Sequence, residues 1–359
     1  MTERARSDKR TRQDLEGTGH IDPSRSVEIF LKRALDDPSV ALTQFQRFGT
    51  GHSGDTYRAV LHRSTRPDDD IVVRLSPTGV RIAGPADVGR QGRIMGTLHQ
   101  NDLPAPAVLA SDSTGAVDGR SIAVMSLVSG AEWHEFAERH SHDETANAAV
   151  SALKAIQTLS VEESGIAGDP RMPPEGEIAR WVPLVERGPD HVQDAADELR
   201  VQLLRELDRS DPSAEPVLVH GDYHFGNLLF GPRTVNAVFD WEIAGLGHPL
   251  TDLACLTVAA LRRRYEPEPN PTGSVEVTGA RLAELYGADP DVLSWHVAAS
   301  CFKYAAILAY NLQLSRRGRL RDPIYEELQG TMAGLLEDGR AVLDHGVTAF
   351  WPDAHAPQA

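Results

Sequence analysis

Six polar side chains that can bind metals or move protons lie within one short stretch of the chain, residues 217–247 (VLVHGDYHFGNLLFGPRTVNAVFDWEIAGLG). Short apolar runs, typical of buried strands, separate them. Polar groups are costly to bury unless each has a partner. We therefore expect the polar residues at these strand ends to have a functional role. The six residues are His220, Asp222, His224, Asn227, Asp240 and Glu242.

Three of these residues follow the order that phosphoryl transfer from MgATP requires. One carboxylate receives or orients the proton of the acceptor hydroxyl, and a later Asn and Asp hold Mg²⁺ against the phosphates. Asp222, Asn227 and Asp240 have this order. A tight β-hairpin turning at residues 231–232 would bring Asn227 and Asp240 together at its open end, where they could share one ion. Their hard oxygen ligands suit Mg²⁺ better than a softer metal.

A glycine-rich stretch upstream fits the same chemistry. Residues 49–54 (GTGHSG) match G-x-G-x-x-G, a pattern that dinucleotide-binding folds share with kinases. In a dinucleotide-binding fold the third glycine begins a helix, whereas the residues after Gly54 alternate as in a strand. The pattern predicts a β-hairpin in which Gly49, Gly51 and Gly54 let the backbone cover a nucleotide's phosphates. An ordinary glycine-rich turn is the alternative for this motif alone.

Other interpretations apply to the polar stretch. His220 and His224 have the H-x3-H spacing of metal ligands, so together with Asp240 they could belong to a metal-dependent hydrolase. His224 and Trp241 could simply pack within a loop. Glu242 could contact the substrate or a second ion, or it could form a local salt bridge.

Composition narrows the class of protein. The 359 residues carry a net charge of −16, which disfavours nucleic acid and anionic membranes as partners. The two cysteines, Cys255 and Cys301, lie in apolar stretches, so we expect no disulfide framework and a reducing, cytoplasmic location. We expect neither a signal peptide nor a membrane span, because the apolar stretch 297–310 is too short to cross a bilayer and contains Lys303.

Periodicity divides the chain into a β-rich part and a helical part. Residues 1–21 are charged and predicted to be a disordered tail. Residues 22–128 are expected to form a small nucleotide-binding lobe, and residues 129–350 a larger catalytic and acceptor-binding lobe. Helices are predicted at 22–35, 86–99, 143–158, 176–187, 190–209, 249–264, 279–286 and 290–316. Strands are predicted on both sides of the glycine-rich turn within 46–63 and at 70–76, 121–130, 217–219, 228–230 and 235–239, with loops at 63–70 and 263–274.

The motifs HGDYHFGN (220–227), FDWE (239–242) and GHPLTDLA (247–254) together resemble the aminoglycoside phosphotransferase / choline kinase-like family, distant relatives of protein kinases. The resemblance extends from about residue 45 to the helices near residue 340. It implies an α+β, bilobal, protein-kinase-like fold with a small antiparallel β N-lobe and a larger, mainly helical C-lobe. It also implies an enzyme that uses ATP and Mg²⁺ to phosphorylate a hydroxyl group of a small molecule.

The resemblance assigns roles to individual residues. Asp222 is implied to be the catalytic base, and Asn227 and Asp240 the magnesium ligands. Asp252 is implied to brace the catalytic loop through hydrogen bonds to the loop backbone, and His220 to orient the same loop. The segment around Met125–Gly130 is implied to be the hinge that receives the adenine.

The chain departs from the family pattern at two positions. The family usually has a Lys on the third strand and a Glu on the next helix, where this chain offers Arg74 and Gln91. Arg74 can grip phosphate oxygens with a fork of donors, and Gln91 could hydrogen-bond Arg74 without neutralising it. Turnover is then either normal or reduced, which leaves a nucleotide-binding, pseudokinase-like protein as an alternative. The residues expected to bind the nucleotide are Gly49, Gly51, Gly54, Arg74, Gln91, Met125 and Leu127.

The C-terminal helices are expected to carry the specificity for the acceptor. The helix at 290–316 resembles the branch related to the phosphotransferase modules associated with acyl-CoA dehydrogenases, which is linked to phosphorylation of hydroxyacyl-CoA. An aminoglycoside, a polycation, is the alternative that an acidic lobe would suit. The sequence weakly disfavours an aminoglycoside as the acceptor. It does not specify the acceptor itself, the preference for ATP or GTP, or the oligomeric state. Arginines that could meet a CoA-like tail, or merely suit a helix C-terminus, are Arg316, Arg317, Arg319 and Arg321.

Overall fold

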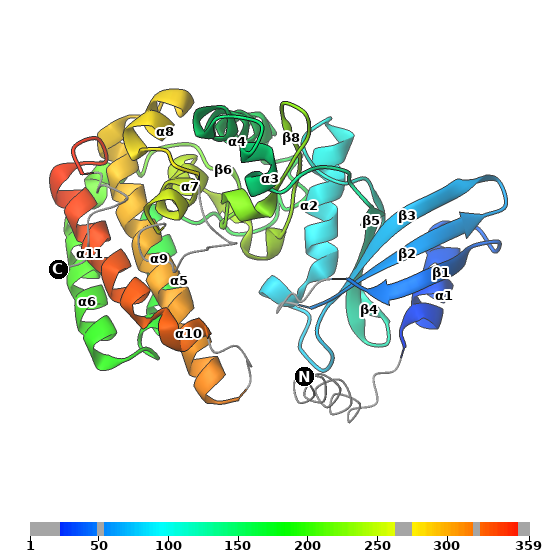
Figure 1. Ribbon diagram of the computed structural model, residues 1–359. Helices are drawn as coiled ribbons and strands as arrows, with labels where there is room; N and C mark the ends of the chain where they lie inside the picture. The colour runs from blue at the N-terminus through cyan, green and yellow to red at the C-terminus, as the bar shows by residue number, and fades with distance from the viewer. Residues whose placement is uncertain (1–21, 49–53, 263–274, 319–323, 351–359) are drawn as a thin grey trace, which may run out of the picture.

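The computed structural model of the protein describes residues 22–48, 54–262, 275–318 and 324–350. The predicted tail at 1–21, the loop at 263–274, and Gly49, Gly51, Arg319 and Arg321 therefore lie outside the described residues. Figure 1 shows a β-rich N-terminal lobe beside a larger helical lobe. The predicted fold class, a small antiparallel sheet followed by a mainly helical part, is confirmed.

The N-terminal lobe is built on one antiparallel sheet with the strand order β1-β2-β3-β5-β4. Side chains of successive strand residues point to opposite faces. Val124 accordingly joins the core under α1 (Ser24–Ala34), while Ala123 and Met125 join the core under α2 (Val88–Gln100). The strands are β1 (Ala41–Arg47), β2 (Asp55–Arg63), β3 (Arg66–Leu75), β4 (Val108–Val117) and β5 (Arg120–Ser126).

The pairing of β1 with β2 confirms that the glycine-rich stretch joins two antiparallel strands rather than a strand and a helix. Its last glycine, Gly54, lies directly against β3. A Cβ atom added at Gly54 would lie 2.5 Å from the carbonyl oxygen of Leu75. A side chain at this position would therefore force the strands apart, which explains the need for glycine.

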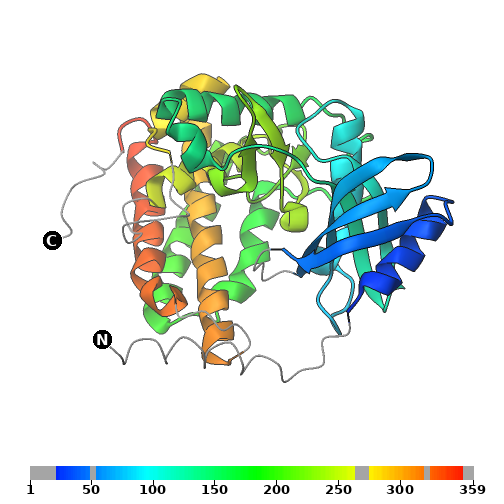
Figure 2. The same cartoon turned by 45° about the vertical axis from the view of Figure 1, so that its right-hand side comes forward.

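The C-terminal lobe is organised around α9 (Pro290–Arg316), which packs against α5, α6, α7 and α11. Figure 2 shows this helix between its neighbours in the helical lobe. By length and composition α9 could cross a membrane, but 89% of its apolar window is buried inside the protein. The surrounding helices are α3 (Trp133–Ala137), α4 (His142–Ile156), α5 (Pro174–Val185), α6 (Asp190–Arg205), α7 (Leu250–Arg262), α8 (Gly279–Tyr286), α10 (Ile324–Glu327) and α11 (Gln329–His345).

Two small sheets lie where the polar stretch was found. β6 (Val217–Val219) pairs with β9 (Gly245–Gly247), and β7 (Leu228–Phe230) pairs with β8 (Val235–Val238), both antiparallel. The pairing of β7 with β8 confirms the predicted hairpin around residues 231–232. Short 3-10 turns precede β7 (Phe225–Asn227) and follow β8 (Trp241–Ile243).

Some predicted boundaries differ from the structure. The strand predicted at 121–130 ends at Ser126. Leu127 still donates one hydrogen bond to β3, and Ala131 then forms a bridge with Phe230 of β7. The strands predicted around the glycine-rich turn within 46–63 are β1 and β2, and the loop predicted at 63–70 is shorter, because β3 begins at Arg66. β4 and β9 were not predicted: β4 is an edge strand with a polar centre, and β9 contains two glycines.

Candidate active site

The loop after β6 is held in place by one buried carboxylate. Asp252, in the first turn of α7, accepts hydrogen bonds from the backbone N–H of His220 at 2.7 Å and of Gly221 at 2.8 Å. Burial raises the pKa of the Asp252 carboxyl, and the adjacent His220 together with the two N–H groups offsets this in part. Gly221 itself has φ +82°, and a Cβ there would lie 2.8 Å from the Ile243 carbonyl oxygen. The loop therefore has little freedom to move.

The His220 ring is engaged through both of its nitrogen atoms. Nδ1 accepts a hydrogen bond from the backbone N–H of Asp222 at 3.1 Å. Nε2 must then carry the proton, which it donates to the carbonyl oxygen of Phe239 at 2.6 Å. The ring packs 4.6 Å from Trp241, centroid to centroid. His220 thus ties the loop to the end of β8, and neither nitrogen remains for a metal.

Asp222 is surrounded by hydrogen-bond donors. Its Oδ1 accepts a hydrogen bond from the Tyr304 hydroxyl at 2.7 Å, and Nε2 of His224 lies 3.5 Å from Oδ2. Burial alone would raise the pKa of this carboxyl, but His224, the Lys303 ammonium and Tyr304 together hold it well below its ordinary value. Asp222 is therefore an ionised carboxylate at any physiological pH.

The hairpin of β7 and β8 brings Asn227 and Asp240 to the same end. The Phe239 N–H donates to the Asn227 carbonyl oxygen at 2.9 Å, so the two chain segments are paired just before Asp240. The Asn227 side-chain nitrogen donates to the Asp222 carbonyl oxygen at 2.9 Å. Asp240 has a left-handed backbone, with φ +67°. The structure thus gathers Asp222, Asn227 and Asp240 at the open end of one hairpin.

Arg74 of β3 reaches across from the other lobe to this end. Both Nη1 and Nη2 lie 3.1 Å from Oδ1 of Asp240. Gln91 of α2 is buried, and its amide nitrogen donates to the Pro85 carbonyl oxygen rather than to Arg74. Glu242 lies in the 3-10 turn directly after Asp240 and is half-buried. The structure therefore brings Arg74, but not Gln91, to the polar site.

The segment between the lobes runs close to β7. Met125 is buried in β5, and the Leu127 N–H donates to the Asp70 carbonyl oxygen of β3 at 3.0 Å. A Cβ atom at Gly130 would lie 2.6 Å from Cγ of Leu229 in β7. This close contact fixes how the connection crosses from one lobe to the other.

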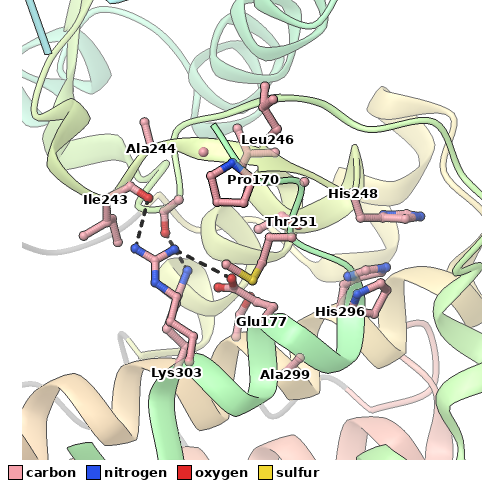
Figure 3. A pocket seen from close by; sticks show the side chains of 18 of the residues that line it. Pro170, Glu177, Ile243, Ala244, Leu246, His248, Thr251, His296, Ala299 and Lys303 are labelled. Atoms are coloured by element: carbon pink, nitrogen blue, oxygen red, sulfur yellow. Dashed lines mark hydrogen bonds and ion pairs between the residues drawn. The ribbon is translucent and has the colours of Figure 1, made fainter. Parts of the chain in front are cut away.

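A pocket of about 180 Å³ lies beside the loop that carries Asp222, since Gly221 is among its lining residues. Figure 3 shows side chains that line this pocket. Glu177 of α5, Ala299 and Lys303 of α9, and Leu246 of β9 line it, and it reaches the backbone of Gly221, the residue before Asp222. Most of its wall is apolar. A small organic molecule bound here would lie next to the loop that carries Asp222.

The charged residues of the pocket are mixed in sign. Arg90 donates to the Asp169 carboxylate at 2.9 Å through Nε, and Nη1 of Arg180 lies 3.8 Å from the Glu177 carboxylate. With Lys303, three cationic side chains face two acidic ones. The lining of the pocket is therefore not net negative, although the chain as a whole is acidic.

Two stacked histidines line the same pocket. The rings of His248 and His296 lie 4.0 Å apart, and Nε2 of His296 bonds to the Ser210 carbonyl oxygen at 3.0 Å. Burial lowers the pKa of both rings, that of His296 to about 3, so both are neutral. Among the described residues, Nε2 of His248 has no hydrogen-bond partner.

α9 holds the loop through two side chains that were not predicted as site residues from the sequence. Lys303 is buried and donates to the Gly221 carbonyl oxygen at 2.6 Å and to Sγ of Cys255 at 2.8 Å. The adjacent Tyr304 binds Asp222. One signal was present in the sequence, because a lysine inside an apolar helix is seldom buried without a partner. The sequence alone does not identify the groups that Lys303 contacts.

The phosphotransferase enzyme family matches residues 44–288. Acyl-CoA dehydrogenase family member 11 of Rattus norvegicus is 29% identical over 306 residues, which cover 79% of this chain and 38% of that protein. Acyl-CoA dehydrogenase family member 10 of Mus musculus is 26% identical over 310 residues, covering 80% and 28%. The chain thus spans well under half the length of these relatives.

Solved structures agree on the fold. A candidate aminoglycoside phosphotransferase from Ralstonia eutropha JMP134 superposes with a TM-score of 0.69 at 22% identity, covering 90% of this chain and 98% of that chain. Aminoglycoside phosphotransferase APH(4)-Ia, in ternary complex with AMP-PNP and hygromycin B, superposes with a TM-score of 0.58 at 15% identity, covering 88% and 97%. The fold is that of these protein-kinase-like enzymes, and because the family match covers more than half of the chain, the protein belongs to the phosphotransferase enzyme family.

Proposed function

We propose that this protein transfers the γ-phosphoryl group of MgATP to a hydroxyl group of a small molecule. One observation carries the proposal: Asp222, Asn227 and Asp240 meet at the open end of the β7–β8 hairpin. Their order and their proximity match the needs of in-line phosphoryl transfer. The AMP-PNP and hygromycin B bound to APH(4)-Ia, a nucleotide analogue and a small molecule, support the same type of reaction for this fold.

The residues fit a magnesium-dependent reaction. Asn227 donates through its side-chain nitrogen, which leaves its side-chain oxygen for an ion, and Asp240 adds a carboxylate. Both are oxygen ligands of the kind that Mg²⁺ prefers. When bound, Mg²⁺ would neutralise charge on the β- and γ-phosphates. Arg74, beside Asp240, supplies a further positive charge to the same place.

Asp222 would orient the acceptor hydroxyl. Its carboxylate is held ionised, so it is a weak base that accepts a hydrogen bond readily and a proton only late. This suits a loose transition state, in which the nucleophile needs alignment more than early deprotonation. The residue that performs the chemistry is thus fixed by its neighbours before any substrate arrives.

We place the acceptor in the pocket beside Gly221. With three cationic and two acidic side chains, it does not favour a polycation such as an aminoglycoside. A hydroxyacyl-CoA is a more specific candidate for the acceptor, and the similarity to acyl-CoA dehydrogenase family members supports it. The arginine cluster at the end of α9 gives it less support, because Arg316 is engaged by Glu326 at 2.7 and 2.8 Å.

The metal-dependent hydrolase is disfavoured by the histidines themselves. His220 uses both ring nitrogens in hydrogen bonds, and Nδ1 of His224 accepts from the Gly226 N–H at 3.1 Å. Within the described ranges, no group of three or more His, Cys, Asp and Glu side chains is placed to hold a metal ion. The H-x3-H spacing is thus better explained by loop structure.

The replacement Asp222→Asn tests the proposal. We expect turnover of MgATP to fall at least about 100-fold, because the acceptor loses its orienting carboxylate. Nucleotide affinity, measured by calorimetry with Mg²⁺ and AMP-PNP, should change little. Asp197→Asn, an exposed carboxylate of α6 paired with Arg200, is the matched control and should keep full activity. Full activity in Asp222→Asn would refute the assignment. If the wild-type protein binds the nucleotide but turns over MgATP no faster than Asp222→Asn, the result would favour a pseudokinase-like protein.

A thermal-shift screen addresses the acceptor. ATP and GTP with Mg²⁺ are crossed with aminoglycosides, choline-like amines and hydroxyacyl-CoAs, because a ligand that binds only the folded protein raises its melting temperature. We expect a shift with hydroxyacyl-CoAs and none with aminoglycosides. A shift with kanamycin or hygromycin B alone would overturn the preference derived from the pocket charges.

A further inference from the structure

We infer that Tyr304 is a positioning residue for phosphoryl transfer, through which α9 sets the orientation of the reacting carboxylate. The inference rests on the proposed function, because it assumes that Asp222 orients the acceptor. Its starting point is one contact: the Tyr304 hydroxyl donates to Oδ1 of Asp222 at 2.7 Å. The two residues are 82 positions apart in the sequence and come from different elements.

The neighbouring residue of α9 holds the backbone of the same loop. Lys303 donates to the carbonyl oxygen of Gly221 at 2.6 Å, and the Cys255 thiol lies 3.5 Å from the same oxygen. An ammonium group with 1% exposure is costly without strong partners, so these contacts compensate a real desolvation cost. Two consecutive residues of α9 thus hold two consecutive residues of the loop, one by its backbone and one by its side chain.

The helix that supplies both contacts is well suited to act as a rigid support. α9 is buried on nearly all sides by α5, α6, α7 and α11, and Tyr304 is only 6% exposed. The Lys303 ammonium lies 4.7 Å from the centre of the Tyr304 ring, which restrains the ring further. A side chain anchored in a close-packed core transmits its position to whatever it binds.

The contact matters because a carboxylate can turn about its last bond. The terminal torsion of Asp is broad and nearly two-fold, so an unrestrained carboxylate presents either oxygen at many angles. Tyr304 binds Oδ1, which leaves Oδ2, 3.5 Å from Nε2 of His224, to meet the acceptor hydroxyl. Removing the tyrosine hydroxyl would free this rotation without removing the carboxylate, and misplacement of a reacting group by about 1 Å can cost 100-fold in rate.

The replacement Tyr304→Phe tests the inference, because it removes one hydroxyl and keeps the ring. ADP formation from MgATP, with water as the probe acceptor, gives kcat per folded enzyme and KM for MgATP. We expect kcat to fall about 10- to 100-fold, the effect of a lost hydrogen bond to a charged group. KM for MgATP should stay within about two-fold, since the nucleotide lies on the Asn227 and Asp240 side. Thermal melting establishes the folded fraction at the assay temperature.

The matched control is Tyr310→Phe, on the same helix, where the ring faces Arg187 at 5.4 Å. It should leave kcat and KM unchanged. If the folded Tyr304→Phe enzyme has the same kcat as the wild type, the positioning role is wrong, even if the melting temperature falls. That result would mean that Tyr304 has only a structural role. Equal losses in both variants would also overturn it. A wild-type protein without Asp222-dependent ADP formation would instead overturn the proposed function, and with it this inference.

Discussion

Asp252→Asn should cost this protein both stability and turnover, although the side chain hardly changes in shape. Asp252 is 1% exposed, and its two oxygens accept backbone hydrogen bonds of 2.7 and 2.8 Å from His220 and Gly221. Asparagine keeps one acceptor but turns an NH₂ group toward the other N–H. One charge-assisted hydrogen bond is lost and a buried donor is left unpaired, so we expect a loss of about 2–4 kcal/mol in the free energy of unfolding.

Denaturant unfolding measures this loss directly. The midpoint should move to lower denaturant at unchanged slope, because the mutation changes the stability of the fold rather than the surface that unfolding exposes. Asp143→Asn is the matched control: Asp143 also lies in the first turn of a helix, but it is exposed and paired with Arg281 at the surface. Such a pair contributes up to about 1 kcal/mol, so the control should lose clearly less.

Turnover provides the second readout. The loop that carries Asp222 is released at two consecutive N–H groups, so kcat should fall even under conditions in which the variant remains folded. A loss of stability below about 0.5 kcal/mol, or a stable variant with wild-type kcat, would show that the two hydrogen bonds do not hold the loop.

Three further predictions follow from local geometry. Gly221→Ala should cost more stability than Gly287→Ala and lower turnover as well: both glycines have φ +82°, but only at Gly221 would the new Cβ meet backbone, 2.8 Å from a carbonyl oxygen. The pKa of His296, lowered by burial and His248 to about 3 from 6.5, means that the unfolded chain binds a proton first as the pH falls. Stability should therefore drop by about 2 kcal/mol between pH 6.5 and 5 through His296, and His296→Gln should remove this part of the slope and leave the part due to His248, whose pKa burial also lowers. Arg74→Ala should weaken MgATP binding in calorimetry at least about 10-fold, because a charged fork beside Asp240 is lost.

Each of these predictions can be contradicted by a simple result. Equal effects in the two glycine variants would mean that the close approach at Gly221 is relieved at no cost. The same pH slope in the wild type and in His296→Gln would assign the titration to other groups. Unchanged affinity in Arg74→Ala would place that arginine outside nucleotide binding.

The parts of the site that sequence predicts are local. Asn227 and Asp240 are thirteen positions apart, and the apolar runs between them with Gly-Pro at the turn are enough to predict a hairpin. Strand behaviour after Gly54 likewise separates a β-hairpin from a strand–helix turn. In both cases the hydrophobic pattern and the turn residues lie within one short window, so pairing follows from them.

The parts that sequence could not predict depend on long-range packing. Nothing in the apolar pattern of α9 shows that Lys303 and Tyr304 face a loop 82 residues away, because a helix buried on all sides has no distinctive face. β4 was missed for a related reason: its centre, Ser111–Gly115, is polar, and an edge strand gains its order from its neighbour β5 rather than from its own alternation.

Arg74 was predicted from the sequence as a site residue, but its contact with Asp240 is seen only in the structure. At the sequence level it stands where the family usually has lysine, and a single ammonium would bind one oxygen as a point charge. In the structure the arginine directs two nitrogens at one oxygen, Oδ1 of Asp240, from a distance of 3.1 Å each. Because both contacts go to Oδ1, one carboxylate can be held from β3 and still offer its other oxygen to a cation. Arg74→Lys, which keeps the charge and loses the fork, should therefore leave Asp240 less well fixed and lower the affinity for Mg²⁺ with AMP-PNP, whereas affinity equal to that of the wild type would mean that charge alone suffices at this position.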